Sequence, residues 1–302
     1  MEMPTDQSVL VTGGAGFIGS HLVDALVADN DVVVLDNLSS GRREWVDDRA
    51  TLIAADLHNA QAVDQAVDGV DYIFHEAANV SVEHSVDAPV ESHETNVDAT
   101  LRLLEHARNE DARFIYASSA AVYGTPESIP IDESDPKQPT SPYGLEKHSA
   151  DEYCRLYHEI YGVETIALRY FNVYGPRQRG GQYSGVIDIF LDQARREEDL
   201  TIHGDGKQTR DFVHVDDVVT ANCLAATHGV PGEAYNIGTG SSITIKDLAQ
   251  LVVDTFETNS SVTHIDARDG DIEQSCPSIR KAQRELGFEP TQSLNSKLEA
   301  LW

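Results

Sequence analysis

The chain has 302 residues, 40% of them hydrophobic and 24% charged, which is ordinary for a folded protein with enough apolar residues for a sizeable core. It carries 51 acidic residues against 22 basic ones, only six of them lysine, and its net charge is −29. This charge argues against nucleic-acid binding, which needs a basic face. No apolar run approaches the roughly 18 residues of a transmembrane helix, so no membrane partner is expected.

The acidic residues are scattered through the chain rather than gathered in one tail. A surface of this kind repels itself in dilute buffer, but at about 1 M salt the Debye length falls to roughly 3 Å and the repulsion is screened. We interpret the charge as adaptation to a salt-rich cytoplasm. An incidentally acidic enzyme is the alternative.

The start of the chain, Met1–Gln7, is polar and has no basic segment, which argues against a secretory signal. Cys154, Cys223 and Cys276 lie far apart and form no CxxC pair. We therefore expect reduced, structural thiols in a cytoplasmic protein, and no metal site.

The first half of the chain alternates short β-branched runs with longer helical patterns, which predicts a parallel sheet covered by helices on both faces. The expected strands are Val9–Val11, Val32–Leu35, Leu52–Ala54, Tyr72–Phe74, Phe114–Ala117 and Thr165–Leu168. Apolar residues at helical spacing predict a helix between the first two strands, namely Ile18, Leu22, Ala25 and Leu26.

The second half predicts a strand at Tyr235–Ile237 and helices that start near Val215 and at Thr244, where Thr244 and Asp247 fit a capping box. Prolines and glycines predict loops at Tyr123–Pro142 and Tyr174–Gly185.

No flexible linker separates two domains, so a substrate-binding part must be built from insertions and the C-terminal third. The expected fold is α/β, a doubly wound parallel sheet with a smaller C-terminal α/β domain. The dinucleotide-binding domain would span residues 1–170 and be rejoined by about 213–238, and residues 171–212 and 239–302 would form the substrate domain.

The segment VLVTGGAGFIGS over residues 9–20 combines a strand, a glycine turn and a helix start. Gly13, Gly16 and Gly19 would let the backbone approach a pyrophosphate at the positive end of the helix. The second strand ends in Asp36, about 20 residues on, where an acid can bind both ribose hydroxyls and repel a 2′-phosphate. The pattern predicts NAD binding in preference to NADP, against the alternative of a simple tight turn.

Tyr143 and Lys147 lie four residues apart at the start of a helical stretch that runs to about Tyr161, so they share one helix face. A nearby lysine cation and a positive nicotinamide would favour the phenolate of a tyrosine base. The alternative is an ordinary surface pair. Ser118 and Ser119, at the end of an expected strand, favour a catalytic site because sites gather at that edge of such sheets.

Nine motifs then follow one another in the order of a known family. They are the glycine turn from Thr12, Asp36-Asn37, Asp56-Leu57, HEAAN at 75–79, Asn96-Val97, SSAAVYG at 118–124, Tyr143 with Lys147, RYFNVYGPR at 169–177 and GDGKQTRDF at 204–212. The set resembles the extended short-chain dehydrogenases, in their NAD-dependent sugar epimerase/dehydratase branch. The resemblance covers nearly the whole chain, to about Pro290.

The resemblance implies a role for each matching residue. Ser119, Tyr143 and Lys147 would be catalytic. The residues implied around NAD are Gly13, Gly16, Phe17, Ile18, Gly19, Asp36, Asn37, Asp56, Leu57, Ala77, Asn96, Ser118, Tyr143, Lys147 and Tyr170.

For a nucleotide-sugar substrate the resemblance implies Ser119 and Tyr143 at the sugar, and Asn172, Arg210 and Arg268 at the diphosphate. His203 would pack on the base. Alternatives remain for three of these: Arg210 could pair with Asp211, Asn172 could be a buried turn residue, and Arg268 could be solvated.

Dehydratases and decarboxylases of this branch carry an acid just after the catalytic hydroxyl residue, whereas Ser119 is followed by Ala120 and Ala121. This favours an isomerase that inverts the sugar 4-hydroxyl through a keto intermediate, with UDP-glucose and UDP-galactose as first candidates. A dehydratase, decarboxylase or reductase remains the alternative, and a non-catalytic NAD sensor or scaffold is the alternative of another class.

The segment RDGDIEQS places Ser275 where the branch has a residue of the pocket wall, and a small side chain there would leave space for UDP-N-acetylhexosamines. The resemblance also implies a homodimer, paired through the helix of Tyr143 and a helix near Glu94–Arg108.

Overall fold

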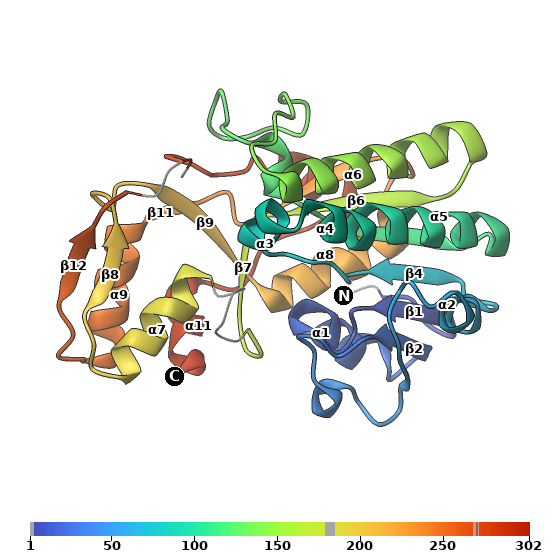
Figure 1. Cartoon of the computed structure of the whole chain (residues 1–302), viewed down its shortest axis with the longest axis horizontal. Coiled ribbons are helices and arrows are strands. Elements are labelled where there is room, and N and C mark those ends of the chain that lie inside the picture. The colour runs from blue at the N-terminus through green and yellow to red at the C-terminus, as the bar shows by residue number, and fades with distance from the viewer. Residues whose placement is uncertain (1–2, 179–184, 268–269, 271) are drawn as a thin grey trace.

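The computed structural model describes residues 3–178, 185–267, 270 and 272–302. They form a larger part around a seven-stranded sheet and a smaller part beside it, joined through β7, β9 and β11 (Figure 1).

The larger sheet confirms the expected fold class. All of its neighbouring strands are parallel, in the order β10-β6-β5-β4-β1-β2-β3. Each strand expected from the sequence lies inside an observed one. The strands are β1 (Ser8–Thr12), β2 (Asp31–Asp36), β3 (Thr51–Ala54), β4 (Tyr72–His75), β5 (Arg113–Ser119), β6 (Thr165–Tyr170) and β10 (Ala234–Ile237).

Helices cover both faces of this sheet (Figure 1). They are α1 (Phe17–Leu26), α2 (Ala60–Val67), α3 (Val82–Asp87), α4 (Pro89–His93), α5 (Ala99–Glu110), α6 (Pro142–Tyr161), α8 (Val215–His228) and α10 (Arg280–Leu286). Short 3-10 turns lie at Arg43–Trp45 and Ala120–Tyr123, and a π turn at Glu94–Asp98 leads into α5.

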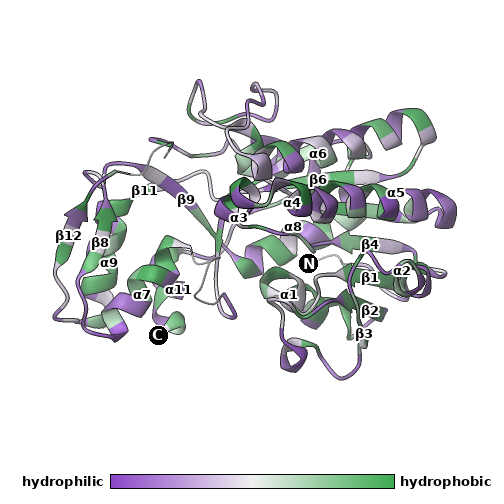
Figure 2. Ribbon diagram, viewed as in Figure 1, coloured by the Kyte–Doolittle hydropathy of each residue, from purple (hydrophilic) through white to green (hydrophobic). Residues whose placement is uncertain are grey.

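Two apolar layers hold the sheet. One packs α1 and α8 on one face, around residues such as Leu22 and Val218, and the other packs α2, α5 and α6 on the opposite face, around residues such as Leu103. The strands are hydrophobic while the outer helix faces are hydrophilic (Figure 2). Such strands are rich in apolar residues because both of their faces are buried. In β6 all six residues are buried, including Arg169, whose charge is paired with Asp151.

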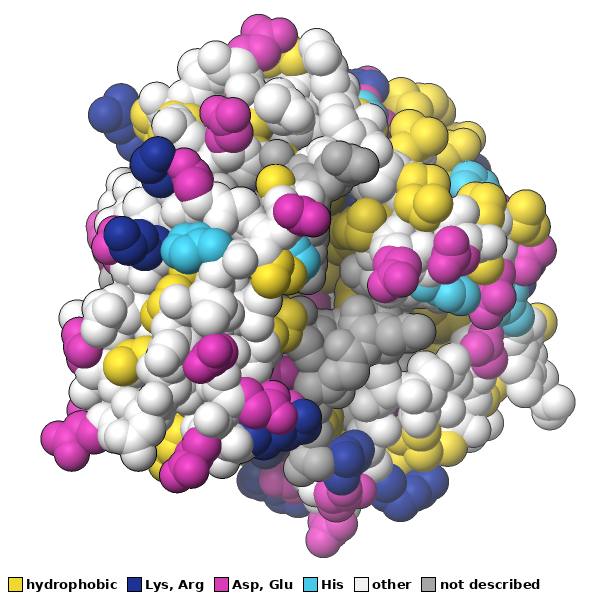
Figure 3. Space-filling model, turned by 60° about the vertical axis from the view of Figure 1, so that its left-hand side comes forward, with side chains coloured by type: hydrophobic (Ala, Val, Ile, Leu, Met, Phe, Trp, Pro, Cys, Tyr) yellow, Lys and Arg dark blue, Asp and Glu magenta, His cyan; other side chains and the backbone are white. Residues whose placement is uncertain are grey.

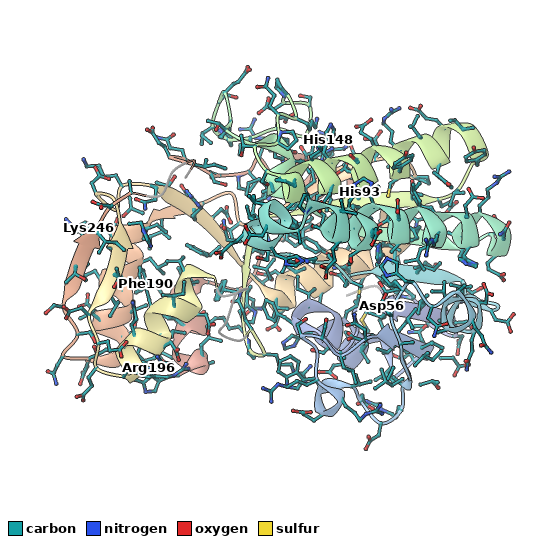
Figure 4. All side chains as sticks on the ribbon, in the orientation of Figure 1. Asp56, His93, His148, Phe190, Arg196 and Lys246 are labelled. Carbon is teal, nitrogen blue, oxygen red and sulfur yellow. The ribbon has the colours of Figure 1, made fainter. Side chains whose placement is uncertain are left out.

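The smaller part contains two short sheets, in the orders β11-β9-β7 and β12-β8. Its elements are β7 (Asn172–Tyr174), α7 (Val186–Arg195), β8 (Leu200–His203), β9 (Thr209–His214), β11 (Ser242–Thr244), α9 (Ile245–Phe256), β12 (Val262–Ile265), α11 (Leu294–Leu298) and a 3-10 turn at Glu299–Leu301. The smaller part has a separate hydrophobic core between these helices and strands, and Phe190 of α7 lies in it (Figure 4). The domain boundaries expected from the sequence stay a prediction.

Local signals placed several element ends correctly. Thr244 caps α9 by accepting a hydrogen bond from the Asp247 N–H at 3.0 Å, and its own hydroxyl donates to the Asp247 carboxylate at 2.7 Å. Residues 124–141 contain no helix or strand of more than one residue, and residues 175–178 are likewise irregular. The remainder of the second expected loop, up to residue 184, lies outside the described residues.

The order of the larger sheet reverses between β1 and β4, since the chain moves outward on one side through β2 and β3 and on the other through β5 and β6. Ligands of such sheets bind beyond the carboxyl ends of the strands at this reversal. Among the described residues, no helix is long and apolar enough to cross a membrane.

Candidate active site

The glycine turn lies at the carboxyl end of β1, at the reversal point of the sheet. Gly13 has a φ of +69°, and a Cβ built on it would lie 2.7 Å from the Ala77 nitrogen. A Cβ on Gly19 would collide with the carbonyl oxygen of Gly13. Only glycine fits these positions, because a side chain on Gly13 would meet the loop after β4 and one on Gly19 would meet the turn itself.

Helix α1 begins immediately after this turn. Its N-cap is Gly16, which offers no side chain to the first N–H groups of the helix, and Phe17 and Ile18 form the first turn, partly exposed. Free N–H groups at a helix start bind anions, and the helix dipole adds to the attraction. The glycine turn and the start of α1 therefore fit the pyrophosphate of a dinucleotide.

Asp36 ends β2 beside the glycine turn. Its carboxylate accepts hydrogen bonds from the Ala15 N–H at 3.0 Å and from the Leu38 N–H at 2.7 Å. A carboxylate has about four acceptor positions, so these bonds orient Asp36 and leave capacity for the two ribose hydroxyls. Next to it, Asn37 donates to Asp56 at 2.8 Å, which ties together two further residues predicted at the cofactor.

Asn96 is buried and supports the loop after β4, which contains Ala77. Its amide donates to the Asn79 carbonyl at 2.9 Å and accepts from the Asn79 N–H at 2.8 Å. It also donates to Glu146 of α6 at 2.7 Å. Because all of these partners are protein groups, Asn96 holds the loop that contains Ala77 in place. Leu57 packs in the apolar layer under α2 and α5.

The three predicted catalytic residues meet between β5 and α6. Ser119 ends β5, its hydroxyl is near enough to the Tyr143 phenol to lower the pKa of that group, and it accepts from the Ala121 N–H at 3.1 Å. Tyr143 is the second residue of α6. Its N–H donates to the hydroxyl of Ser85 in α3 at 3.1 Å, which satisfies one of the open N–H groups at the helix start.

Lys147 follows one helical turn later and is buried. Its ammonium group donates to the Ala117 carbonyl at 2.7 Å and lies 4.9 Å from the centre of the Tyr116 ring. Burial lowers the pKa of Lys147 to about 8. Burial also raises the pKa of Tyr143, and the neighbouring Ser119 hydroxyl opposes this rise. As the base expected from the sequence, Tyr143 would need positive charge nearby to form its phenolate.

Ser118 points into a buried polar network rather than toward Tyr143. Its hydroxyl donates to Asp151 at 2.7 Å, and Asp151 forms a two-bond ion pair with Arg169, both bonds 2.9 Å long. Arg169 in turn donates to the Tyr123 hydroxyl at 3.0 Å. The side chain of Ser118 thus fixes α6 against β5 and β6, and its predicted role at NAD stays a prediction.

Tyr170 ends β6 and donates its hydroxyl to the Glu76 carboxylate at 2.8 Å. Glu76 follows β4 and is partly exposed, and burial of its carboxyl group raises its pKa to about 7. The sequence motif at 75–79 contained this acid, but no role was predicted for it. The available signal was its position, an acid directly after a buried strand at the binding edge.

Three of the predicted substrate residues gather around β9. Asn172 of β7 donates to the Asp211 carbonyl at 2.9 Å, and Arg210 of β9 donates to the Thr209 and Ile272 carbonyls at 2.8 and 2.6 Å. Ser275 is buried, and its N–H donates to the Thr209 carbonyl at 3.2 Å. Asn172 is thus a strand residue and not a turn residue.

His203 ends β8 and interacts with the Asp266 carbonyl at 3.1 Å. Arg268 lies outside the described residues. A hollow between the two parts of the molecule is lined by Arg42 and Trp45 from the larger part and by Asp188, Asp192 and Arg195 of α7 from the smaller part. Figure 3 shows a groove between the two parts of the molecule.

Residues 9–238 match the model of the NAD dependent epimerase/dehydratase family. The match covers most of the chain and includes the glycine turn, Ser119, Tyr143 and Lys147. The chain belongs to this family of nucleotide-sugar enzymes, and its cofactor is NAD.

Similar proteins include several epimerases. The UDP-glucose 4-epimerase of Mycolicibacterium smegmatis is 37% identical over 294 residues, 94% of each chain. A UDP-N-acetylglucosamine 4-epimerase from Methanobrevibacter ruminantium M1, solved with UDP-N-acetylmuramic acid, has a TM-score of 0.94 at 39% identity and covers 98% of this chain and 97% of its own. A UDP-glucose 4-epimerase of Thermotoga maritima, solved with UDP-glucose, has a TM-score of 0.93 at 38% identity and covers 97% and 96%.

Relatives with other activities are almost as similar. UDP-glucuronic acid decarboxylase 2 of Arabidopsis thaliana is 36% identical over 296 residues, which cover 96% of this chain and 66% of the plant protein. The dTDP-glucose 4,6-dehydratase DesIV of Streptomyces venezuelae, solved with NAD, has a TM-score of 0.90 at 34% identity and covers 97% and 95%. Overall similarity therefore does not separate the reactions.

Proposed function

We propose that the protein is a UDP-sugar 4-epimerase. The observation that carries this proposal is that Ser119 at the end of β5 lies by Tyr143 at the start of α6, with Lys147 one helical turn away and with Ala120 and Ala121, not an acid, after the serine. These groups can move one proton to and from a sugar hydroxyl. Dehydration or decarboxylation at this position would call for a further acid.

In the proposed reaction Tyr143 removes the proton of the sugar 4-hydroxyl while that carbon is oxidised to a ketone. NAD, when bound, supplies the acceptor for the sugar's hydride and the means to return it. The Ser119 hydroxyl orients the reacting oxygen, and Lys147 stabilises the phenolate. After the ketosugar has turned in the pocket, Tyr143 returns the proton, so nothing is consumed.

The ketosugar must not leave before it is reduced. We infer that the smaller part, residues 171–212 and 239–302, retains it by its nucleotide, with Asn172, Arg210 and Arg268 at the diphosphate and His203 at the base. Binding energy from these remote groups then serves the step at carbon 4. The clustering of Asn172 and Arg210 on adjacent strands supports this assignment.

Two alternatives stand beside the epimerase. A dehydratase, decarboxylase or reductase on the same scaffold is supported by the relatives with those activities. A non-catalytic NAD sensor has no use for Ser119, Tyr143 and Lys147 gathered between β5 and α6, so this arrangement argues against it. A homodimer through α6 and the helix near Glu94–Arg108 stays a prediction.

The test is incubation of the purified protein with UDP-, dTDP- and GDP-sugars, with the products resolved by NMR. An epimerase converts UDP-glucose and UDP-galactose into each other without added cofactor. A 4-keto-6-deoxy sugar or a released carboxyl group as the main product would replace the proposal by one of its alternatives. No turnover of any sugar would favour the sensor.

The position of Ser275 leads to a prediction about which UDP-sugars the protein accepts. Because its side chain is small, the wild type should also accept UDP-N-acetylhexosamines, whereas Ser275→Tyr should lose these and keep UDP-glucose, since a ring leaves no room for an N-acetyl group in a packed wall. Initial rates on both substrate pairs measure the effect.

The matched control is Gln274→Tyr, because Gln274 is the exposed neighbour of Ser275 and a ring there should change neither rate. Equal losses on both pairs in Ser275→Tyr, or no acetylated turnover in the wild type, would place the wall elsewhere.

A further inference from the structure

His75 connects the glycine turn with the start of α5. It is the last residue of β4 and pairs in register with Thr12, the last residue of β1. Its side chain is buried beside the rings of Phe114 and Tyr116 of β5. Its Nδ1 lies 2.7 Å from the Thr12 hydroxyl oxygen, and its Nε2 lies 2.9 Å from the Thr100 hydroxyl oxygen of α5. Both ring nitrogens are therefore hydrogen-bonded to hydroxyl groups of other elements.

The further partners of the two hydroxyl groups favour one position for the proton of the ring. Thr100 donates its only hydroxyl proton to the Asn96 carbonyl at 2.8 Å, so its oxygen accepts from Nε2 of His75. The Thr12 oxygen accepts from the Ala77 N–H at 3.4 Å, and its own proton can be donated to Nδ1. With the ring proton on Nε2, every donor in this chain of bonds has an acceptor. With a proton on Nδ1, the Thr12 hydroxyl would face a second donor and its own proton would lose its acceptor.

The surroundings of the ring act in the same direction. A buried donor without an acceptor is unfavourable, which disfavours both the other tautomer and the doubly protonated ring. Burial, together with the charge of Lys147, lowers the pKa of His75 to about 3. The ring is therefore neutral, with one nitrogen that donates and one that accepts.

Both ends of this chain of hydrogen bonds hold the loop after β4. At one end Thr12 binds the Ala77 N–H, and at the other the side chain of Asn96 binds the N–H and the carbonyl of Asn79 at 2.8 and 2.9 Å. The Ala77 nitrogen is the atom that a Cβ on Gly13 would approach to 2.7 Å. The chain of bonds thus sets how closely this loop lies against the glycine turn.

We propose that His75 is a positioning residue of the NAD site, neutral and protonated on Nε2, which holds Thr12 and Thr100 and thereby keeps the loop after β4 against the glycine turn. It acts through Thr12 and not by contact with the cofactor, because its own side chain is buried. The inference goes beyond the proposed function and does not depend on it, since NAD binding can be measured without a sugar.

The first test is NMR of the imidazole nitrogens in histidine-labelled protein saturated with NAD. The chain has 12 histidines, so His75→Gln or His75→Asn identifies the signals of His75 by their loss. We expect a proton bonded to Nε2 and none on Nδ1, with no titration between about pH 5 and pH 8, where exposed histidines titrate. A proton on Nδ1, or a ring that titrates in this range, overturns the inference.

The same two variants separate the two bonds of the ring. The amide of asparagine reaches about as far as Nδ1 and that of glutamine about as far as Nε2, so His75→Asn keeps an acceptor for Thr12 and His75→Gln keeps a donor for Thr100. Because Thr12 adjoins the glycine turn, we expect NAD affinity to fall about tenfold in His75→Gln and about threefold or less in His75→Asn. Calorimetry with protein freed of NAD measures both affinities. A ring that only fills space predicts the larger loss for the smaller asparagine, so an equal or larger loss in His75→Asn overturns the inference.

If the His75 variants do not fold, the bond to Thr12 can be removed from its other end. Thr12→Val removes the hydroxyl and keeps the shape of the side chain, so it should weaken NAD binding about tenfold. Thr12→Ser keeps the hydroxyl and should restore most of the affinity. A folded Thr12→Val protein with the NAD affinity of the wild type overturns the inference.

Thr165→Val is the matched control. Thr165 is also fully buried, and its hydroxyl donates to the Cys154 carbonyl at 2.6 Å, but it begins β6 at the end of the strand away from the site. Its replacement should lower the melting temperature and leave NAD affinity unchanged. A loss of NAD affinity in Thr165→Val as large as in Thr12→Val would show that any lost buried hydroxyl weakens binding, and would overturn the assignment to His75.

Discussion

The protonation states of single residues in the site depend on their burial and on the groups around them. Tyr143 is buried, which disfavours its phenolate, and the neighbouring Ser119 hydroxyl opposes this effect. If Tyr143 is the base, as proposed, we expect the positive charge of bound NAD to favour its phenolate further. A base of this kind is active only when its neighbours are in place.

Tyr143→Phe should lower turnover at least 100-fold, within the range that general base catalysis contributes, because only the ionisable oxygen is lost. Folding and NAD binding should be unchanged, as measured by circular dichroism and calorimetry. Tyr161→Phe, at the exposed end of the same helix, should keep full activity. A Tyr143→Phe enzyme with more than about a tenth of wild-type activity would show that another group is the base.

Asp36 should make the protein prefer NAD, because its oriented carboxylate repels a 2′-phosphate. Asp36→Asn removes the charge and should reduce the preference at least about tenfold, the effect of roughly 1.4 kcal/mol. Calorimetry with NAD and NADP measures both affinities. The control is Asp31→Asn, at the exposed other end of β2. Equal binding of NAD and NADP by the wild type would contradict this assignment.

At the scale of elements, the site is made by strand ends and helix starts that face one another across the reversal of the sheet. The turn after β1 leads into α1, and the loop after β4 lies against that turn. The end of β5 faces the start of α6. Each position requires a close approach of two backbones. The glycine turn is the most constrained of these places.

Gly13→Ala should weaken NAD binding more than tenfold, because its Cβ would lie 2.7 Å from the Ala77 nitrogen in addition to straining a positive φ. Gly69→Ala is the matched control. Its φ of +67° is almost the same as that of Gly13, but nothing lies within 4 Å of an added Cβ. It should reduce stability by about 1 kcal/mol and leave NAD affinity unchanged. Similar NAD affinities in the two variants would refute the contact argument.

At the scale of the whole molecule, the net charge of −29 is the dominant feature. Asp and Glu side chains are dispersed over the face in Figure 3 rather than gathered in one patch. Dispersed like charges destabilise the compact state by mutual repulsion. Most of the ion pairs involve exposed side chains, which contribute little each, whereas the Arg169–Asp151 pair is almost fully buried.

The melting temperature and activity should therefore rise with KCl from 0.1 M to about 2 M, since screening at short range removes the repulsion. Differential scanning calorimetry and initial rates over this range provide the measurement. Sucrose at matched osmolality controls for general exclusion effects. A melting temperature that stays flat or falls would remove the salt-adaptation hypothesis and leave the catalytic assignment untouched.

The sequence by itself determined the strands of the larger sheet, several of the helices, the family and its cofactor. Strands of the larger sheet were predictable because their apolar runs are short and bounded by turn residues, and α1, α6 and α9 because their start signals are local. The glycine turn, Asp36 and the pair of Tyr143 and Lys147 were predictable for the same reason. Each is a pattern within about 20 residues that one physical requirement explains.

Only the tertiary structure decided which of these residues meet. It turned the Ser118 hydroxyl to Asp151, made Asn96 a support of the loop after β4, and joined Glu76 to Tyr170 across 94 residues of chain. Such partners are chosen when distant strands take adjacent places in the sheet and a buried polar group must find a hydrogen bond. Local periodicity carries no information about that choice, because it reports which face of an element is buried and not what that face will touch.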